Sequence, residues 1–165
     1  MDILVIGNGM VGYKFCEKLL SKSNPHSFRL TVFGEEPRPA YDRVHLSSYF
    51  SGASGEALQL APADWYLDND IDLHTGELVV GIDRSRKRVT TAHGRTVAYD
   101  KMVLATGSAA FVPAIPGTEK DGVFVYRTIE DLEAIRAYAA GARRAAVIGG
   151  GLLGLEAAKA ALDLG

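Results

Sequence analysis

The sequence predicts an α/β fold in which a parallel β-sheet is joined to helices through glycine-rich turns. Short apolar runs alternate with amphipathic stretches of helical period. The same G-x-G-x-x-G pattern follows an apolar run at residues 7–12 and again at residues 149–154. Each pattern lies between a predicted strand and a predicted helix, the context that a dinucleotide-binding motif requires.

Composition indicates a globular protein. Of the 165 residues, 47% are hydrophobic, and the formal net charge is −2. This length suffices for one domain with a sizeable core but not for two complete dinucleotide-binding domains. Charges of both signs are mixed without a basic stripe, so we expect no nucleic-acid partner. No apolar run reaches the roughly 18 residues of a membrane span, and no secretory signal is recognised. We therefore expect a cytoplasmic protein.

The first elements form a βαβ unit. Residues 2–6 are predicted as a buried strand, 10–22 as a helix and 28–33 as a second strand. Residues 35–55 are expected to form a long ordered loop. The predicted apolar face of the helix comprises Val11, Phe15, Leu19 and Leu20.

The middle of the chain predicts a β-meander inserted between strands of the main sheet. A short helix at residues 63–69, with Trp65 and Leu67 partly buried, precedes a strand at 71–73. A buried strand at 101–105 follows the meander. The three antiparallel strands of the meander are expected at residues 77–83, 87–92 and 95–99.

The last part begins at a capping box, in which Thr128 and Asp131 open a helix that runs to about Ala140. A strand at 144–148 and a helix at 152–164 follow, with Gly165 at the C-cap position. We expect two domains, residues 1–118 and 119–165. Only 11 residues follow Gly154 in this chain, so the second nucleotide site is expected to be incomplete.

The first fingerprint suits a pyrophosphate. Gly7 permits the tight turn, Gly9 lets the backbone approach the phosphates, and Gly12 lets the helix pack on the strand. Free N–H groups and the helix dipole attract the negative charge. The alternative is an ordinary glycine-rich turn.

An acidic residue about 20 positions further on is expected to bind the ribose. Glu35 follows the second strand, and Glu36 is an alternative for the same role. A carboxylate here favours FAD or NAD over NADP. Arg43 is either a bidentate clamp on a pyrophosphate or a local partner of Asp42 or Glu36.

Other candidate groups carry weaker signals. The turn Ala105-Thr106-Gly107 after a buried strand either approaches a ligand through its backbone or simply ends the strand. Cys16, the only cysteine, is predicted on the inner part of the first helix, so it is expected to be a small core residue rather than a reactive thiol. The four histidines are scattered without metal-site spacing, and we expect no metal.

The order and spacing of these motifs resemble those of the two-dinucleotide-binding flavoprotein reductases. The resemblance implies a Rossmann-like FAD-binding domain with a β-meander insertion, followed by the truncated start of a Rossmann-like NAD(P)H-binding domain. The implied activity is transfer of a hydride from NAD(P)H to FAD for onward electron transfer. No side chain is implied as an acid–base catalyst. The implied cofactor-binding residues are Gly7, Gly9, Met10, Val11, Gly12, Glu35, Arg43, Val79, Ala105, Thr106, Gly107, Gly149, Gly151, Gly154 and Glu156.

Within this family, residues 35–50 resemble the branch whose sirohaem and iron–sulfur cluster lie far downstream, with a small subunit as the expected protein partner. Reductases of rubredoxin or ferredoxin are the alternative. Relatives that reduce ferredoxin-like proteins often carry a lysine soon after the position of Arg43, whereas this chain has Leu46, Ser47 and Ser48. A catalytically inactive nucleotide-binding fragment is a third reading, and residues 1–165 alone are expected to be inactive.

Overall fold

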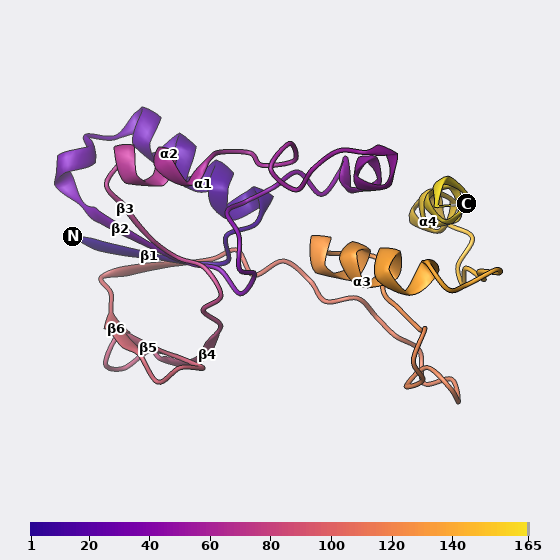
Figure 1. The fold of residues 1–165 in the computed structure, drawn as a ribbon. Helices are drawn as coiled ribbons and strands as arrows, with labels where there is room; N and C mark the ends of the chain where they lie inside the picture. Colours follow the sequence, from indigo (N-terminus) through magenta and orange to yellow (C-terminus); the bar gives the residue numbers. More distant parts are fainter. Residues whose placement is uncertain (165) are drawn as a thin grey trace. The chain divides into compact units, whose positions relative to one another are not determined.

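In the computed structural model, which describes residues 1–164, four strands form a parallel sheet in the order β3-β2-β1-β7 (Figure 1). Strand β1 (Asp2–Ile6) lies between β2 (Arg29–Phe33) and β7 (Lys101–Leu104). Strand β3 (Ile71–His74) pairs with the outer side of β2. This arrangement confirms the predicted α/β class with a parallel sheet.

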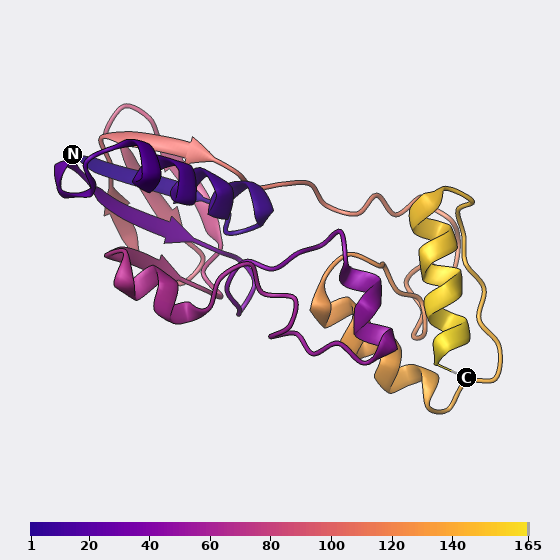
Figure 2. The same ribbon diagram turned by 90° about the horizontal axis from the view of Figure 1, so that it is seen from above.

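Helices cover one face of this sheet and the meander covers the other (Figure 1). The helical face carries α1 (Met10–Lys22), which runs along β1 and β2 (Figure 2), and α2 (Ala63–Asp68). The short 3₁₀ helix η1 (Pro25–Ser27) precedes β2. The antiparallel meander consists of β4 (Val79–Asp83), β5 (Arg88–Thr91) and β6 (Thr96–Ala98), as predicted.

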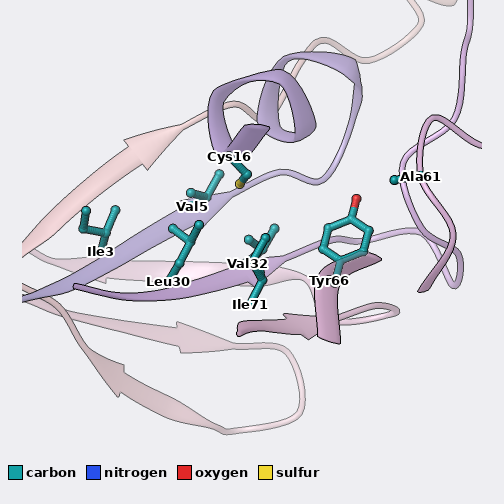
Figure 3. Close-up of a cluster of buried hydrophobic side chains, with 8 residues drawn as sticks. All are labelled: Ile3, Val5, Cys16, Leu30, Val32, Ala61, Tyr66 and Ile71. Atoms are coloured by element: carbon teal, nitrogen blue, oxygen red, sulfur yellow. The ribbon is translucent and has the colours of Figure 1, made fainter. Parts of the chain in front are cut away.

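Strand β1 supplies two cores because alternate side chains of a strand point to opposite faces. Ile3 and Val5 join a buried cluster under the helices, together with Cys16 from α1 (Figure 3). Leu4 and Ile6 join a second cluster on the meander side. The apolar run at the N-terminus therefore reads as one continuous stretch because both faces of its strand are covered.

Three burial predictions are wrong for positional reasons. Strand β7 is an edge strand of the described sheet, and Leu104 is 61% exposed rather than buried. In α2 the buried residue is Tyr66, while Leu67 is 71% exposed. In α1, Phe15, Leu19 and Leu20 pack against the core, but Val11 is 70% exposed. Val11 lies one residue into the helix, immediately after the glycine-rich turn.

The chain divides into two compact units. Residues 1–41 and 59–108 form the first unit, and residues 42–58 with those from 109 onward form the second. The loop at 42–58 thus belongs with the later part of the chain, a grouping that differs from the two domains expected from sequence. A division by function at residue 118 stays a prediction.

Within residues 1–164, the second unit contains three helical segments. The 3₁₀ helix η2 (Leu46–Ser51) contacts both α3 (Ile129–Ala139) and α4 (Leu152–Asp163) (Figure 2). The predicted capping box is confirmed: Thr128 Oγ1 accepts from the N–H of Asp131, and the Asp131 carboxylate accepts from the N–H of Thr128. The predicted C-cap at Gly165 lies outside the described residues.

The predicted strand at 144–148 is wrong. These residues have no regular secondary structure, and Ile148 is 81% exposed. A strand requires a hydrogen-bonded neighbour, and no strand among residues 1–164 pairs with this segment. Apolar sequence alone therefore did not produce a strand here. Among residues 1–164, no helix is both long and apolar enough to cross a membrane.

Candidate dinucleotide site

The first glycine-rich turn leads from β1 into α1 with no room for side chains at two of its glycines. Gly7 has a φ of +108°, and an ideal Cβ there would lie 2.2 Å from the carbonyl oxygen of Ala105. A Cβ on Gly12 would lie 2.0 Å from the carbonyl oxygen of Gly7. Both clashes involve backbone atoms, so neither neighbour can rotate away. Glycine at these two positions is a packing requirement of the turn itself.

Gly9 has the opposite environment. An ideal Cβ at Gly9 would meet no described atom within 4 Å, and its φ of −90° suits any residue. Gly9 is the N-cap of α1, where no side chain caps the helix and no acidic residue lies in the first turn. The N-terminal amides of α1 therefore meet open space at the positive end of the helix dipole. This space and these donors fit the pyrophosphate of a dinucleotide.

The two neighbouring carboxylates after β2 have different environments. Glu36 is half-buried and accepts a hydrogen bond of 2.6 Å from the hydroxyl of Tyr41. Glu35 has an exposed side chain. The backbone on both sides of Glu35 is fixed, because Gly34 donates to His74 (2.8 Å) and the carbonyl of Glu36 accepts from Gly76 (2.9 Å). Of the two alternatives left by the sequence, Glu35 is the carboxylate presented to solvent on a fixed backbone.

The other candidates of the first unit follow β7, open β4 or lie in the first turn of α1. Ala105 follows β7 and donates 2.7 Å to the carbonyl of Ile6, beside the fingerprint turn. Thr106 and Gly107 follow it and are exposed, and Gly107 has a φ of +68°. Val79 opens β4 and packs against the meander-side cluster. The remaining two candidates, in the first turn of α1, are half-buried Met10 and exposed Val11.

The second glycine-rich turn repeats the geometry of the first. Gly149 has a φ of +122°, and a Cβ on Gly154 would lie 2.0 Å from its carbonyl oxygen. Gly151 is the N-cap of α4 with φ −78° and ψ 179°, close to the −90° and −167° of Gly9. The difference lies beneath the turn: a Cβ on Gly149 would meet no described atom within 4 Å. The first turn rests on Ala105, after the neighbouring strand β7, whereas the second has no such support among residues 1–164.

Arg43 and Glu156 lie in the second unit. Arg43 Nη1 donates to the carbonyl of Arg127 at 3.4 Å. Asp42 is engaged with His45, whose Nδ1 lies 2.7 Å from its carboxylate, and this hydrogen bond lowers the pKa of Asp42. Glu156, on α4, accepts from the hydroxyl of Ser47 at 3.2 Å. Ser47 lies in the segment 46–48, which holds no lysine, whereas ferredoxin-type relatives often carry one soon after the position of Arg43.

The structure brings the predicted residues together in two groups. One group lies in the first unit: Gly7, Gly9, Met10, Val11, Gly12, Glu35, Val79, Ala105, Thr106 and Gly107. The other lies in the second unit: Arg43, Gly149, Gly151, Gly154 and Glu156. Arg43 therefore does not belong to the compact unit that carries the first fingerprint. The assignment of each residue to a ligand stays a prediction.

Sequence reasoning missed Asn8 and Tyr66. The hydroxyl of Tyr66, on α2, donates 3.1 Å to Asn8 Oδ1 inside the first fingerprint. The position of Asn8 between two motif glycines was a signal for it. Tyr66 had no signal, because it lies 58 residues away and only the packing of α2 brings it to the turn.

Cys16 is confirmed as a core residue. Its side chain is fully buried, and burial raises the pKa of its thiol to about 12. The thiolate is the nucleophilic form of cysteine, and the Cys16 thiol stays protonated at neutral pH. Residues 1–164 also contain no second cysteine that could form a dithiol pair with it. Residues 1–164 contain no group of three or more His, Cys, Asp and Glu side chains arranged to hold a metal ion.

The first glycine-rich turn, between a parallel strand and a helix, and its repeat at residues 149–154 have the geometry of dinucleotide-binding turns. The chain belongs to the pyridine nucleotide-disulphide oxidoreductase family, whose model matches residues 1–165. The predicted family and fold class are confirmed.

Individual proteins of this family are similar to the chain over nearly its whole length. The chain is 52% identical over 163 residues to the nitrite reductase (NADH) large subunit of Escherichia coli, covering 99% of this chain and 19% of that protein. It is 46% identical over 164 residues to the assimilatory nitrate reductase electron transfer subunit of Bacillus subtilis, covering 99% and 21%. The NADH:rubredoxin oxidoreductase of Clostridium acetobutylicum has a similar structure, with a TM-score of 0.90, 30% identity and coverage of 99% and 42%. The chain thus spans about a fifth of the length of these two curated relatives.

Proposed function

We propose that this chain is the FAD-binding part of an NAD(P)H-dependent oxidoreductase of the nitrite reductase large-subunit type. The proposed parent protein accepts a hydride from NAD(P)H and passes electrons onward to nitrite. The observation that carries this proposal is the paired geometry of Gly12 with Gly7 and of Gly154 with Gly149. Two turns of one shape call for two dinucleotides, and the identity to the E. coli subunit extends over both of them.

Different residues of the first unit bind different parts of FAD. The amides after Gly9 receive the pyrophosphate, with Gly7 and Gly12 keeping the turn tight and Met10 and Val11 lining it. Glu35 accepts hydrogen bonds from the adenosine ribose. The backbone of Val79 faces the adenine. The turn Ala105-Thr106-Gly107 approaches the cofactor through its backbone.

The second unit supplies the start of the nicotinamide site. Gly149, Gly151 and Gly154 form its turn, and Arg43 reaches the FAD phosphates or the flavin side. The Ser47 hydroxyl holds the Glu156 carboxylate in one orientation near the rings. Bound FAD supplies the electron-carrying chemistry that no side chain provides. The chain's own contribution is to orient the ligands and exclude water.

We further propose that nitrite reduction itself takes place on a sirohaem and an iron–sulfur cluster in a later part of the parent protein. A small nitrite reductase subunit is the proposed partner, in line with the electron transfer subunit named among the relatives. Residues 1–165 alone are proposed to be inactive, and the parent is proposed to be cytoplasmic. The proposed domain division remains 1–118 and 119–165.

Reduction of rubredoxin or a ferredoxin is the second candidate function. The structural likeness to NADH:rubredoxin oxidoreductase favours it. Two observations weigh against it. The identity is 30% there against 52% for the nitrite reductase subunit. In addition, residues 46–48 hold no lysine, which ferredoxin-type relatives often carry soon after the position of Arg43. The nitrite reductase type is therefore the better-supported function.

Absorption spectroscopy of the purified full-length parent tests this choice. Sirohaem bands together with a flavin spectrum are expected, and a flavin spectrum alone would favour the carrier reductase. For residues 1–165, we expect weak or no FAD retention through purification and no loss of flavin colour when NADH is added without oxygen. A stoichiometric yellow protein that NADH bleaches would contradict the proposal that this piece is inactive.

A further inference from the structure

The side chain of Asn8 is held from outside the fingerprint. Tyr66 donates its hydroxyl proton to Asn8 Oδ1 over 3.1 Å. The Tyr66 side chain is 1% exposed and lies between Val32, Ile71 and Ala61 in the cluster under the helices (Figure 3). Burial raises the pKa of this hydroxyl, so it keeps its proton and remains the donor. Tyr66 therefore acts as a rigid support whose only polar atom faces the turn.

The other end of the Asn8 amide has no acceptor among the described residues. Its Nδ2 atom is buried and unpaired. A buried donor without a partner costs about 1–3 kcal/mol, so stability alone does not explain an asparagine here. Its carbonyl end, by contrast, is engaged by Tyr66. The contact fixes which way the amide faces.

Asn8 is also confined by the backbone beside it. An ideal Cβ on Gly34, just after β2, would lie 3.0 Å from the Asn8 Cβ, closer than most such contacts. Asn8 is thus confined on one side by Gly34 and held by Tyr66. Since Asn8 lies between Gly7 and Gly9, fixing its side chain fixes the turn whose amides face the open space.

We propose that Tyr66 is a positioning residue for the first fingerprint, acting through Asn8 to hold the turn in the shape that accepts a pyrophosphate. This inference rests on the proposed FAD site. It assigns a role to α2, which carries none of the predicted ligand-binding residues. Tyr66 touches no ligand itself.

Tyr66→Phe removes the hydroxyl and keeps the ring. Tyr13→Phe is the matched control, because Tyr13 packs against the same cluster and its hydroxyl interacts with Glu17. The dissociation constants of ADP and of adenosine are measured by calorimetric titration of the full-length parent protein after its flavin has been removed. Loss of one neutral hydrogen bond corresponds to about a 3- to 10-fold weaker ADP complex. Adenosine, which has no pyrophosphate, should bind Tyr66→Phe and wild type alike, and Tyr13→Phe should match wild type for both ligands.

A double-mutant cycle with Asn8→Ala tests the path of the effect. If Tyr66 acts through Asn8, its hydroxyl has no contact with the fingerprint side chain in Asn8→Ala and keeps only its backbone neighbour Ala40. Tyr66→Phe should then weaken ADP no further in the Asn8→Ala background. Equal weakening of ADP and adenosine, or unchanged ADP affinity in Tyr66→Phe, would overturn the inference while leaving the FAD site intact. Absence of ADP binding by the flavin-free wild-type parent would instead overturn the proposed function, and the inference with it.

Discussion

A Cβ on Gly12 would lie 2.0 Å from the carbonyl oxygen of Gly7, so the first turn of α1 and the end of β1 touch backbone to backbone. The same relationship joins Gly154 to Gly149. Glycine is needed at the helix position for packing, independently of any ligand. The three glycines of the motif therefore have separable physical roles, which substitutions can tell apart.

Gly12→Ala should destabilise the fold. Its methyl group would overlap a backbone oxygen that cannot move without shifting β1 or α1. Overpacking of this kind costs about 1–3 kcal/mol. Urea unfolding should show the free energy of unfolding reduced by at least this amount. A variant as stable as wild type would mean that α1 moves away from β1 at little cost.

Gly9→Ala should leave the fold nearly intact and weaken ligand binding. A Cβ at Gly9 meets no described atom, and the φ of −90° suits alanine. Alanine is a poorer N-cap than glycine, so we expect a loss of stability below about 1 kcal/mol. The methyl group would occupy the space proposed for the pyrophosphate, weakening ADP by about 10-fold or more, or about 1.4 kcal/mol. Unchanged ADP affinity would place the phosphates elsewhere.

Glu35→Gln should weaken FAD without affecting stability. The side chain is exposed, so its replacement should change the free energy of unfolding by less than about 0.5 kcal/mol. Hydrogen bonds to a charged group contribute about 1.5–3 kcal/mol, and the matching loss is roughly 10- to 150-fold in affinity. Fluorescence titration of the flavin-free full-length parent with FAD measures this loss. Glu36→Gln is the comparison: it loses the charge that accepts from Tyr41, and a larger binding defect there would transfer the ribose role to Glu36.

Alkaline pH should destabilise the fold through Cys16. Its folded pKa is about 12 against an ordinary value of 9.0, so between these values the folded state retains a proton that the unfolded state has lost. Stability is then fully present below about pH 9 and falls by up to about 1.4 kcal/mol per pH unit above it. The raised pKa of Tyr66 acts in the same direction at higher pH.

Cys16→Ala isolates this contribution. The variant should show a shallower decline of unfolding free energy between about pH 9 and pH 11, while starting from a lower value because of the cavity it leaves. Identical slopes for the two proteins would show that Cys16 does not titrate in the folded-to-unfolded transition.

Local sequence signals predicted most elements of the first unit. The period of α1, the alternation along β2 and the turns of the meander depend on near neighbours in the chain, and each element formed where expected. The capping box at Thr128 also formed, because its two hydrogen bonds span only three residues. Burial was less predictable. Leu104, Leu67 and Val11 are exposed because of where their elements lie, which no local pattern encodes.

The segment at 144–148 shows most clearly that local sequence signals do not determine whether a strand forms. Its apolar run is similar to that of β1, yet only β1 has neighbouring strands among residues 1–164, and only β1 is a strand. The conformation of such a run depends on partners that lie far away in the sequence. The glycine turn that follows at 149–154 formed even without that strand, because the close approach of Gly154 to Gly149 joins residues near each other in the sequence.

The sequence by itself determined the two glycine-rich turns, the helices that follow them and the candidate ribose carboxylate, since these depend on residue types a few positions apart. Only the tertiary structure decided that Glu35 rather than Glu36 is free to face solvent, because Tyr41 engages the latter. It alone brought Tyr66 to Asn8 across 58 residues. The packing of α2 against the sheet determines that contact, and packing is a property of the assembled fold.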